Sequence, residues 1–354
     1  MKILVTGASG FVGANLIEVL KDAGNKVIAT SRSRVEQPGI FYVASPELGS
    51  EADWTPALSG IDAVVHLAGR AHVTAEQTDA KTDQAYLRIN AEGTRALAAQ
   101  CAAAGVKHFI FLSSCHAIAG ESDDVLTDRT VPQPVTAYGR SKLAAEEAIK
   151  SVLADSGCAW TILRPPLVYG PGNKANFGLL VKLVQTGLPL PLASVRNRRS
   201  FIYVENLVDL IATCLGSPKA FGKIFLPSDG DDVSTAELIE KIARANESVQ
   251  CPVSSDSVPS KATRHTLPGC SDGMRLSPIP SGSRARHSAR LFHFPPSLLN
   301  AAGRLPGLGA LRKLTSSLYV DSEPIQRDLG WTPPFTFEEG LRRTLMAPTE
   351  KADQ

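Results

Sequence analysis

The sequence predicts an α/β protein built on a doubly wound parallel sheet, with a smaller mixed lobe toward its C-terminus. Short apolar runs recur through the first half, glycine, small or hydroxyl residues follow them, and helical periodicity separates them. Continuous apolar runs are typical of parallel strands, which are buried on both faces. We expect strands at residues 3–6, 26–30, 62–69 and 106–114.

Length, charge and cysteine usage exclude several classes of protein. The chain has 354 residues, 43% of them hydrophobic, which suffices for one large domain and a smaller lobe. Its 37 basic and 35 acidic residues nearly cancel, so no overall field favours nucleic acid. The six cysteines form no CxxC pair, which argues against metal sites and disulfides. With no run of 18 apolar residues, we expect a cytoplasmic protein without membrane insertion.

The first apolar run leads into a glycine turn and then a helix. Gly7, Gly10 and Gly13 follow residues 3–6, and helical periodicity continues to residue 23. This order is typical of Rossmann folds, where glycines permit a tight turn and the close approach of a pyrophosphate at the helix N-terminus. The expected cofactor contacts in this turn are Gly7, Gly10, Phe11, Val12 and Gly13.

The end of the second apolar run bears on the phosphate state of the cofactor. In Rossmann folds an acidic residue at this place binds the adenosine ribose hydroxyls of NAD. This chain has Ser31, Arg32, Ser33 and Arg34 there, without a carboxylate. Arg32 or Arg34 could accept the 2′-phosphate of NADP, or both could face water. The sequence therefore leaves NAD and NADP open.

Two further strand ends place small and polar residues at the same edge of the sheet. Leu67 and Ala68 follow His66, and small residues there let the chain pass close to an adenine or ribose. We expect His66 itself to be a hydrogen-bonded core residue. The later strand ends on Ser113 and Ser114. Because the carboxyl ends of parallel strands form the ligand crevice, Ser114 would point to where a substrate hydroxyl is held.

Tyr138 and Lys142 carry the candidate chemistry. Residues four apart on a helix share one face, so the lysine ammonium can lie beside the phenol. A nearby cation lowers the pKa of a phenol, which favours the phenolate and lets the tyrosine exchange a proton with a sugar or alcohol hydroxyl. Asn90 could be a polar tie near these residues or an ordinary helix residue. The spacing alone is common, and the preceding motifs give it weight.

Together, the glycine turn, His66–Gly69, the serine pair and Tyr-x-x-x-Lys resemble the extended short-chain dehydrogenase/reductases, specifically the NAD-dependent epimerase/dehydratase family. The resemblance covers about residues 1–245 and resumes at 291–345. It includes Arg164–Gly172 and Arg199–Val204. The chain looks most similar to UDP-sugar 4-epimerases and 4-keto-sugar reductases of bacterial polysaccharide synthesis.

The resemblance implies a role for each matching residue. Lys142 would bind the nicotinamide ribose and tune Tyr138, the acid/base, while Ser114 would hydrogen-bond the reacting sugar oxygen. Asn176 and Arg199 match positions that bind the substrate diphosphate, to which arginine makes bidentate contacts. The full set of expected cofactor contacts is Gly7, Gly10, Phe11, Val12, Gly13, Arg32, Leu67, Ala68, Tyr138 and Lys142.

Cys115 competes with Ser114 for the position of the catalytic hydroxyl. Counting forward from Val106 gives Ser114, whereas counting back from Gly120 gives Cys115, because the chain has one extra residue here relative to the family. We predict Ser114, since the strand fixes it from upstream and a thiol is a poor hydrogen-bond donor. His116 is expected to contact substrate or to be only a loop residue.

The sequence also predicts how the chain divides. We expect a dinucleotide-binding domain over residues 1–165 and a substrate lobe over 166–345 that includes elements returning to the main sheet. Residues 251–290 interrupt this lobe with nine serines, five prolines and no Phe, Tyr or Trp. Such a composition cannot bury a core, so we expect a disordered insertion.

Two classes of function are weighed. The resemblance implies an enzyme that transfers hydride at C4 of a UDP-hexose or UDP-N-acetylhexosamine, as a 4-epimerase or a 4-keto reductase. A dehydratase is disfavoured because no acid follows Ser114. The alternative is a non-catalytic dinucleotide-binding regulator on the same fold. Such proteins usually lose the tyrosine or the lysine, and this chain keeps both. The resemblance further implies a homodimer.

Overall fold

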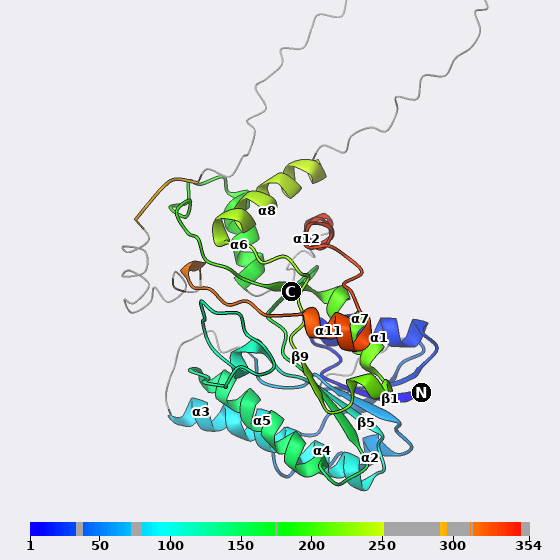
Figure 1. The fold of residues 1–354 in the computed structure, drawn as a ribbon. Coiled ribbons are helices and arrows are strands. Elements are labelled where there is room, and N and C mark those ends of the chain that lie inside the picture. The colour runs from blue at the N-terminus through cyan, green and yellow to red at the C-terminus, as the bar shows by residue number, and fades with distance from the viewer. Residues whose placement is uncertain are drawn as a thin grey trace, which may run out of the picture.

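The computed structural model describes residues 1–32, 38–71, 80–173, 176–250, 291–295, 312 and 314–347. Its main body is a parallel sheet of seven strands in the order β3-β2-β1-β4-β5-β6-β9 (Figure 1). The strands are β1 (Lys2–Thr6), β2 (Lys26–Ser31), β3 (Phe41–Ala44), β4 (Ala63–His66), β5 (His108–Leu112), β6 (Ala159–Leu163) and β9 (Lys223–Phe225). The order reverses between β1 and β4, which confirms the predicted doubly wound Rossmann sheet.

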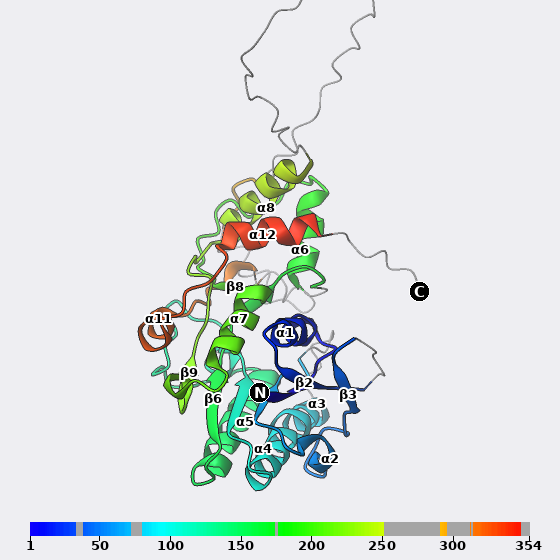
Figure 2. The same ribbon diagram turned by 90° about the vertical axis from the view of Figure 1, so that its right-hand side faces the viewer.

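Helices cover both faces of this sheet, as Figure 2 shows. Successive side chains of β1 point to opposite faces: Ile3 packs in one hydrophobic cluster and Leu4 in the other. The first cluster lies under α1 (Phe11–Asp22) and α7 (Val204–Cys214), and the second under α4 (Gly93–Ala103) and α5 (Ala137–Leu153). The unbroken apolar strands of the sequence therefore reflect burial on both sides. The remaining helical segments of the main body are α2 (Thr55–Leu58), α3 (Ala80–Tyr86), the π-helical turn η1 (Leu87–Glu92), η2 (Cys115–Ala117), η3 (Pro218–Ala220) and α11 (Glu323–Leu329).

A smaller lobe stands above the carboxyl ends of the strands (Figures 1 and 2). Its two-stranded parallel sheet pairs β7 (Leu167–Tyr169) with β8 (Phe201–Tyr203). Around it lie α6 (Asn176–Gln185), α8 (Thr235–Gln250) and α12 (Phe337–Met346). The aromatic rings of Tyr169, Phe177 and Phe337 pack in its core, with centroids 5.1 Å and 5.3 Å from that of Tyr169. The lobe thus has its own hydrophobic core.

The helix α8 begins with the capping box that its sequence predicts. The backbone N–H of Glu237 donates to Ser234 Oγ at 3.1 Å, and the backbone N–H of Ser234 donates to Glu237 Oε2 at 2.7 Å. Two amides that the helix cannot satisfy are therefore bonded reciprocally.

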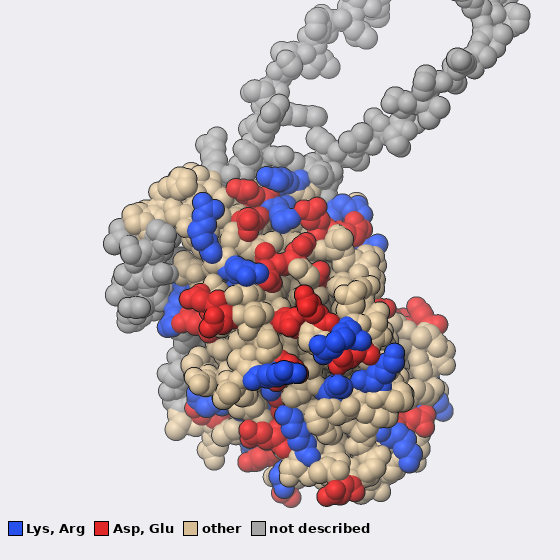
Figure 3. Space-filling view, in the orientation of Figure 1, with Lys and Arg blue, Asp and Glu red and all other residues tan. Residues whose placement is uncertain are grey.

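Some predictions fall outside the described residues. These are the expected insertion at 251–290, Arg34, and residues 296–311 and 313 of the stretch 291–345 in which the resemblance resumes. Asn176 begins α6, but its side chain is likewise outside the description. Among the described residues, no helix is both long and apolar enough to cross a bilayer. Basic and acidic side chains are interspersed over the face drawn in Figure 3, in keeping with the near-zero net charge.

A buried carboxylate, Asp229, joins the lobe to the main body. It follows β9, and its Oδ2 accepts a hydrogen bond from Tyr169 Oη at 2.8 Å. Its Oδ1 accepts from the backbone N–H of Tyr203 at 3.0 Å and from Asn206 Nδ2 at 2.7 Å. Burial raises the pKa of Asp229 from its ordinary 3.8 to about 6, although these hydrogen bonds oppose the rise.

We expect Asp229 to make folding stability depend on pH between about 4 and 6. Because the folded pKa lies above the unfolded one, the stabilising contribution is fully present below pH 3.8 and is lost as pH rises through 6. The difference of about two pKa units corresponds to about 3 kcal/mol. Urea unfolding should show this pH dependence in the unaltered protein and not in Asp229→Asn. Asp155→Asn, at an exposed site, should keep it. An unchanged pH dependence in Asp229→Asn would refute the assignment.

Candidate active site at the carboxyl edge of the sheet

The glycine turn between β1 and α1 has no room for side chains. Gly7 has a φ of +70°, and a Cβ there would lie 2.7 Å from the backbone nitrogen of Ala68. A Cβ on Gly13 would lie 2.3 Å from the carbonyl oxygen of Gly7. Gly10 is the N-cap residue of α1 and has no side chain that could accept a hydrogen bond. It therefore leaves the backbone N–H groups in the first turn of α1 without a side-chain cap. The turn is therefore a cradle that fits the pyrophosphate of a dinucleotide.

His66 is a core residue, as predicted. Its Nδ1 lies 2.7 Å from Thr6 Oγ1, and its Nε2 lies 2.9 Å from Thr94 Oγ1. Burial, and then the nearby charge of Lys142, lowers its pKa to about 3. Thr6 Oγ1 also accepts the backbone N–H of Ala68 at 3.2 Å. The neutral imidazole thus helps to fix the strand ends beneath the glycine turn.

Asn90 is the polar tie that the sequence offered as one of two interpretations. Its Oδ1 accepts the backbone N–H of Arg70 at 2.7 Å, and its Nδ2 donates to the Arg70 carbonyl at 3.0 Å. The same Nδ2 donates to Ser141 Oγ at 2.9 Å. The π-helical turn η1 therefore joins the chain after β4 to α5, next to Lys142.

The structure brings Tyr138 and Lys142 together on α5, directly above the end of β5. Thr136 caps this helix by accepting the backbone N–H of Gly139 at 3.0 Å. Lys142 Nζ donates to the Leu112 carbonyl at 2.8 Å and lies 4.6 Å from the Phe111 ring centroid. It lies 6.0 Å from the ring centroid of Tyr138. The ammonium is thus held between the strand end and the phenol.

The pKa values of this pair differ from the expectation that Lys142 lowers that of Tyr138. Burial raises the pKa of the Tyr138 phenol to about 12, and a hydrogen bond with Ser114 opposes the rise. Burial lowers the pKa of Lys142 to about 8, and the charge of Glu146 opposes that fall. In the chain by itself, desolvation is the largest effect on the Tyr138 pKa, so the phenol remains protonated at neutral pH.

Two rings hold the ring of Tyr138 in place. Tyr86 meets it edge-on, with centroids 6.2 Å apart and planes at 66°. His116 does so at 6.4 Å and 65°. The Arg70 guanidinium lies over Tyr86, with its central carbon 5.4 Å from the ring centroid. Such contacts restrict the ring to one position. Sequence analysis missed Tyr86 and Arg70 as neighbours of Tyr138.

The side chains of Ser114 and Cys115 have different surroundings. Ser114 shares a hydrogen bond with Tyr138, and its Oγ also accepts the backbone N–H of His116 at 3.2 Å. The Cys115 side chain lies in a hydrophobic cluster with Ile118. Burial raises the pKa of its thiol to about 12. Of these two side chains, Ser114 is the one that shares a hydrogen bond with Tyr138.

Arg199, in the smaller lobe, lies close to Cys115 in the serine turn. Its backbone bridges Val233 and Leu318, and its Nη1 donates to the Ser316 carbonyl at 3.3 Å. Burial lowers the pKa of its guanidinium, and the nearby side chain of Cys115 opposes that fall. A partly buried cation therefore faces the serine turn. Arg32, by contrast, is exposed just after β2.

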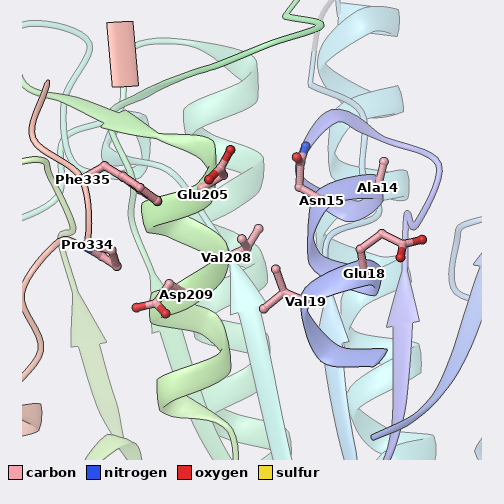
Figure 4. A pocket seen from close by; sticks show the side chains of 9 residues that line it. All are labelled: Ala14, Asn15, Glu18, Val19, Glu205, Val208, Asp209, Pro334 and Phe335. Atoms are coloured by element: carbon pink, nitrogen blue, oxygen red, sulfur yellow. The ribbon is translucent and has the colours of Figure 1, made fainter. Parts of the chain in front are cut away.

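The groove drawn in Figure 4 lies elsewhere. It has a volume of about 450 Å³ and is formed between α1 and α7, with Pro334 and Phe335 at one side. Its lining contains none of the predicted site residues. Its rim is acidic, with Glu18, Glu205 and Asp209. Among the described residues, no group of three or more His, Cys, Asp or Glu side chains could hold a metal ion.

Comparison with known proteins agrees with this geometry. The family model described as "NAD dependent epimerase/dehydratase family" matches residues 3–225. A UDP-glucose 4-epimerase of Vibrio cholerae is 35% identical over 98% of this chain and 94% of that protein. An Escherichia coli O157:H7 protein named N-acetyl-alpha-D-glucosaminyl-diphospho-ditrans,octacis-undecaprenol 4-epimerase is 29% identical over 69% of this chain and 72% of that one.

Solved structures share the fold. The UDP-N-acetylglucosamine 4-epimerase of Bacillus cereus superposes with a TM-score of 0.71 at 21% identity, over 98% of both chains. MoeE5 in complex with UDP-glucuronic acid and NAD gives a TM-score of 0.71 at 22% identity, also over 98% of both chains. The family model covers more than half of this chain, and the Vibrio relative matches almost all of it. The chain therefore belongs to the NAD dependent epimerase/dehydratase family.

Proposed function

We propose that this protein is a UDP-sugar 4-epimerase that acts by hydride transfer at C4. The observation that carries the proposal is the convergence of Ser114, Tyr138 and Lys142 at the carboxyl edge of the sheet. The relative from Vibrio cholerae, named a UDP-glucose 4-epimerase, supports epimerisation over a single reduction. Non-catalytic regulation has no comparable support, because both the tyrosine and the lysine are present and in place.

NAD is the cofactor that we propose for this chain. The glycine cradle fits its pyrophosphate, and the family description specifies NAD. When bound, NAD accepts hydride from the sugar carbon and returns it. Arg32 is exposed and has no defined task with NAD. The residues proposed to hold the cofactor are Gly7, Gly10, Phe11, Val12, Gly13, Leu67, Ala68, Tyr138 and Lys142.

Tyr138 is the proposed acid/base. Its phenolate would accept the proton of the C4 hydroxyl as hydride leaves C4 and so become the phenol, and that phenol would return the proton in the reverse step. Ser114, which shares a hydrogen bond with the phenol, would also hydrogen-bond the reacting sugar oxygen and hold it next to Tyr138. Lys142 supplies the positive charge that stabilises the phenolate once it forms. Because the pKa of Tyr138 in the chain by itself is about 12, the phenol must first release its own proton to solvent, a step that the positive charges of Lys142 and of bound oxidised NAD would favour.

Arg199 is proposed to bind the diphosphate of the sugar nucleotide. Its guanidinium is partly buried next to Cys115, where an anion would compensate the cost of desolvation. Asn176 and His116 are proposed as further substrate contacts, and the ring of His116 lies against that of Tyr138. Asn176 rests on the resemblance of its motif alone.

The organisation of the chain completes the proposal. We place the division between the dinucleotide-binding domain and the substrate lobe at residue 165, where β6 ends and the lobe strands begin. A homodimer in the cytoplasm is proposed from the family resemblance.

The experiment that tests this function measures turnover and cofactor together. The purified protein is denatured and its released cofactor identified. UDP-glucose, UDP-N-acetylglucosamine, UDP-glucuronic acid and their 4-keto derivatives are then each offered with and without NADPH. We expect conversion of one of them to its 4-epimer without net consumption of reduced cofactor. Stoichiometric oxidation of NADPH by the corresponding 4-keto sugar, without epimerisation, would assign a reductase and contradict the proposal.

A further inference from the structure

A buried ion pair lies directly beneath the catalytic group. Arg164 Nε donates to Glu146 Oε1 at 3.0 Å and to Oε2 at 3.1 Å, and Arg164 Nη2 donates to Oε2 at 2.5 Å. The Glu146 side chain is completely buried, and that of Arg164 is 3% exposed. Ser113 Oγ donates to the same carboxylate. A charge pair so deeply buried is costly to form, so its place next to the site calls for a reason beyond stability.

The pair connects three elements that converge on the site. Ser113 directly follows β5, Glu146 belongs to α5, and Arg164 directly follows β6. The backbone of the serine turn is fastened on both sides: Ser113 N–H donates to the Leu163 carbonyl at 2.7 Å, and Cys115 N–H donates to the Pro165 carbonyl at 3.0 Å. Ser114 therefore stands between two backbone ties that flank the ion pair.

Glu146 is also one helical turn beyond Lys142, so both side chains lie on the inner face of α5. Its negative charge acts against the desolvation of the Lys142 ammonium. The other charged or titratable groups around Lys142 are His66 of β4, which is neutral, and Tyr138 of α5, which is protonated. Among the described groups that act on Lys142, Glu146 therefore provides the charge that favours the ammonium.

We propose that Glu146 and Arg164 form a positioning pair that keeps Lys142 charged and the Ser113–Ser114 turn in register with Tyr138. This inference rests on the proposed function, because it assigns a task to residues of the proposed active site. The hydrogen bonds of the Glu146 carboxylate join it to Arg164 and Ser113 and not to the phenol of Tyr138. Arg164 anchors the carboxylate, and the carboxylate acts through Lys142 and Ser113.

The titration of Lys142 tests this proposal without relying on turnover. The full-length protein is labelled with ¹³C at lysine Cε, and the Lys142 signal is identified as the one that Lys142→Met lacks. In the unaltered protein we expect a midpoint of about 8. In Glu146→Gln the midpoint should fall, since the favourable negative charge is gone while Arg164 stays positive. Glu146→Asp should restore it toward that of the unaltered protein.

Two further variants separate charge from folding. Glu147→Gln, at an exposed position of the same helix, should leave the Lys142 midpoint and turnover unchanged. Replacing both Glu146 and Arg164 by Met removes the pair without leaving a lone buried charge, so this variant should fold even if Glu146→Gln does not. Its Lys142 midpoint should lie between those of Glu146→Gln and the unaltered protein.

Turnover provides the second readout. At pH 7 and above, kcat of Glu146→Gln should fall on the order of tenfold, with its alkaline limb moved to lower pH. A folded Glu146→Gln or double-Met variant whose Lys142 midpoint equals that of the unaltered protein would overturn the proposal. Because the titration needs no sugar, this result is independent of whether the UDP-sugar assignment holds.

Discussion

Replacing Tyr138 by Phe is expected to lower kcat by about 10²- to 10⁴-fold, the range that general acid–base groups contribute. The substitution removes only the hydroxyl group, whose oxygen is proposed to accept and return the C4 proton. The ring contacts with Tyr86 and His116 should persist, so the fold and the cofactor site stay intact. Steady-state kinetics on the UDP-sugar that the protein converts, with cofactor affinity measured by calorimetry, checks both parts.

Tyr42→Phe is the matched control for this experiment. Tyr42 lies in β3, the edge strand of the sheet, where it packs against the cluster under α1 and α7. Tyr42→Phe also removes a phenolic hydroxyl. It should keep kcat within about twofold of that of the unaltered protein, because Tyr42 is only partly buried and is not among the proposed site residues. Turnover by Tyr138→Phe at the rate of the unaltered protein would remove the acid/base assignment. Loss of cofactor binding along with turnover would point to a structural effect of this tyrosine.

Replacing Gly13 by Ala is expected to weaken cofactor binding by about 100-fold or more, which corresponds to about 2.7 kcal/mol. The new Cβ would lie 2.3 Å from the Gly7 carbonyl oxygen and 2.7 Å from Ala8 Cα. Both are backbone atoms, so the turn itself must move to relieve the clash. That movement displaces the amides at the start of α1 from the pyrophosphate. Calorimetric titration with NAD measures the loss, and circular dichroism checks the fold.

Gly157→Ala distinguishes this local effect from general damage. Gly157 has a φ of +66°, and a Cβ added there would meet no atom of the described residues within 4 Å, so alanine is strained but has space. We expect some loss of stability, about 1–2 kcal/mol, and unchanged NAD affinity. Binding of NAD by Gly13→Ala as tightly as by the unaltered protein would exclude the glycine turn as the cofactor site.

Much of the fold could be predicted because its signals are local. The four expected strands correspond to β1, β2, β4 and β5, and each apolar run is buried on both faces. The glycine turn could be predicted because only glycine fits at Gly7, next to Ala68, and at Gly13, next to the carbonyl oxygen of Gly7. The choice of Ser114 over Cys115 stays a prediction, which is supported by the contact of the hydroxyl with Tyr138 and by the position of the thiol in a hydrophobic cluster.

Other features depend on how deeply a side chain is buried and on contacts with residues that are distant in the sequence. The helical spacing places Tyr138 and Lys142 on one face but does not reveal how deeply either is buried. Desolvation consequently reversed the expected direction of the tyrosine pKa. Glu146 follows Lys142 by four residues, which is a visible signal, but its partner Arg164 belongs to another strand end. Asp229 likewise gathers Tyr169, Tyr203 and Asn206 only after folding.

The most direct test of hydride transfer at C4 follows an isotope. The UDP-sugar that the protein converts is prepared with deuterium at C4, and the product is examined by NMR after partial conversion in ordinary water. Because the proposed reaction moves a hydride from C4 to the bound cofactor and back without exchange with water, the 4-epimer should keep its deuterium at C4. A product with hydrogen from the solvent at C4 would contradict this account, since it requires C4 to exchange a proton with water.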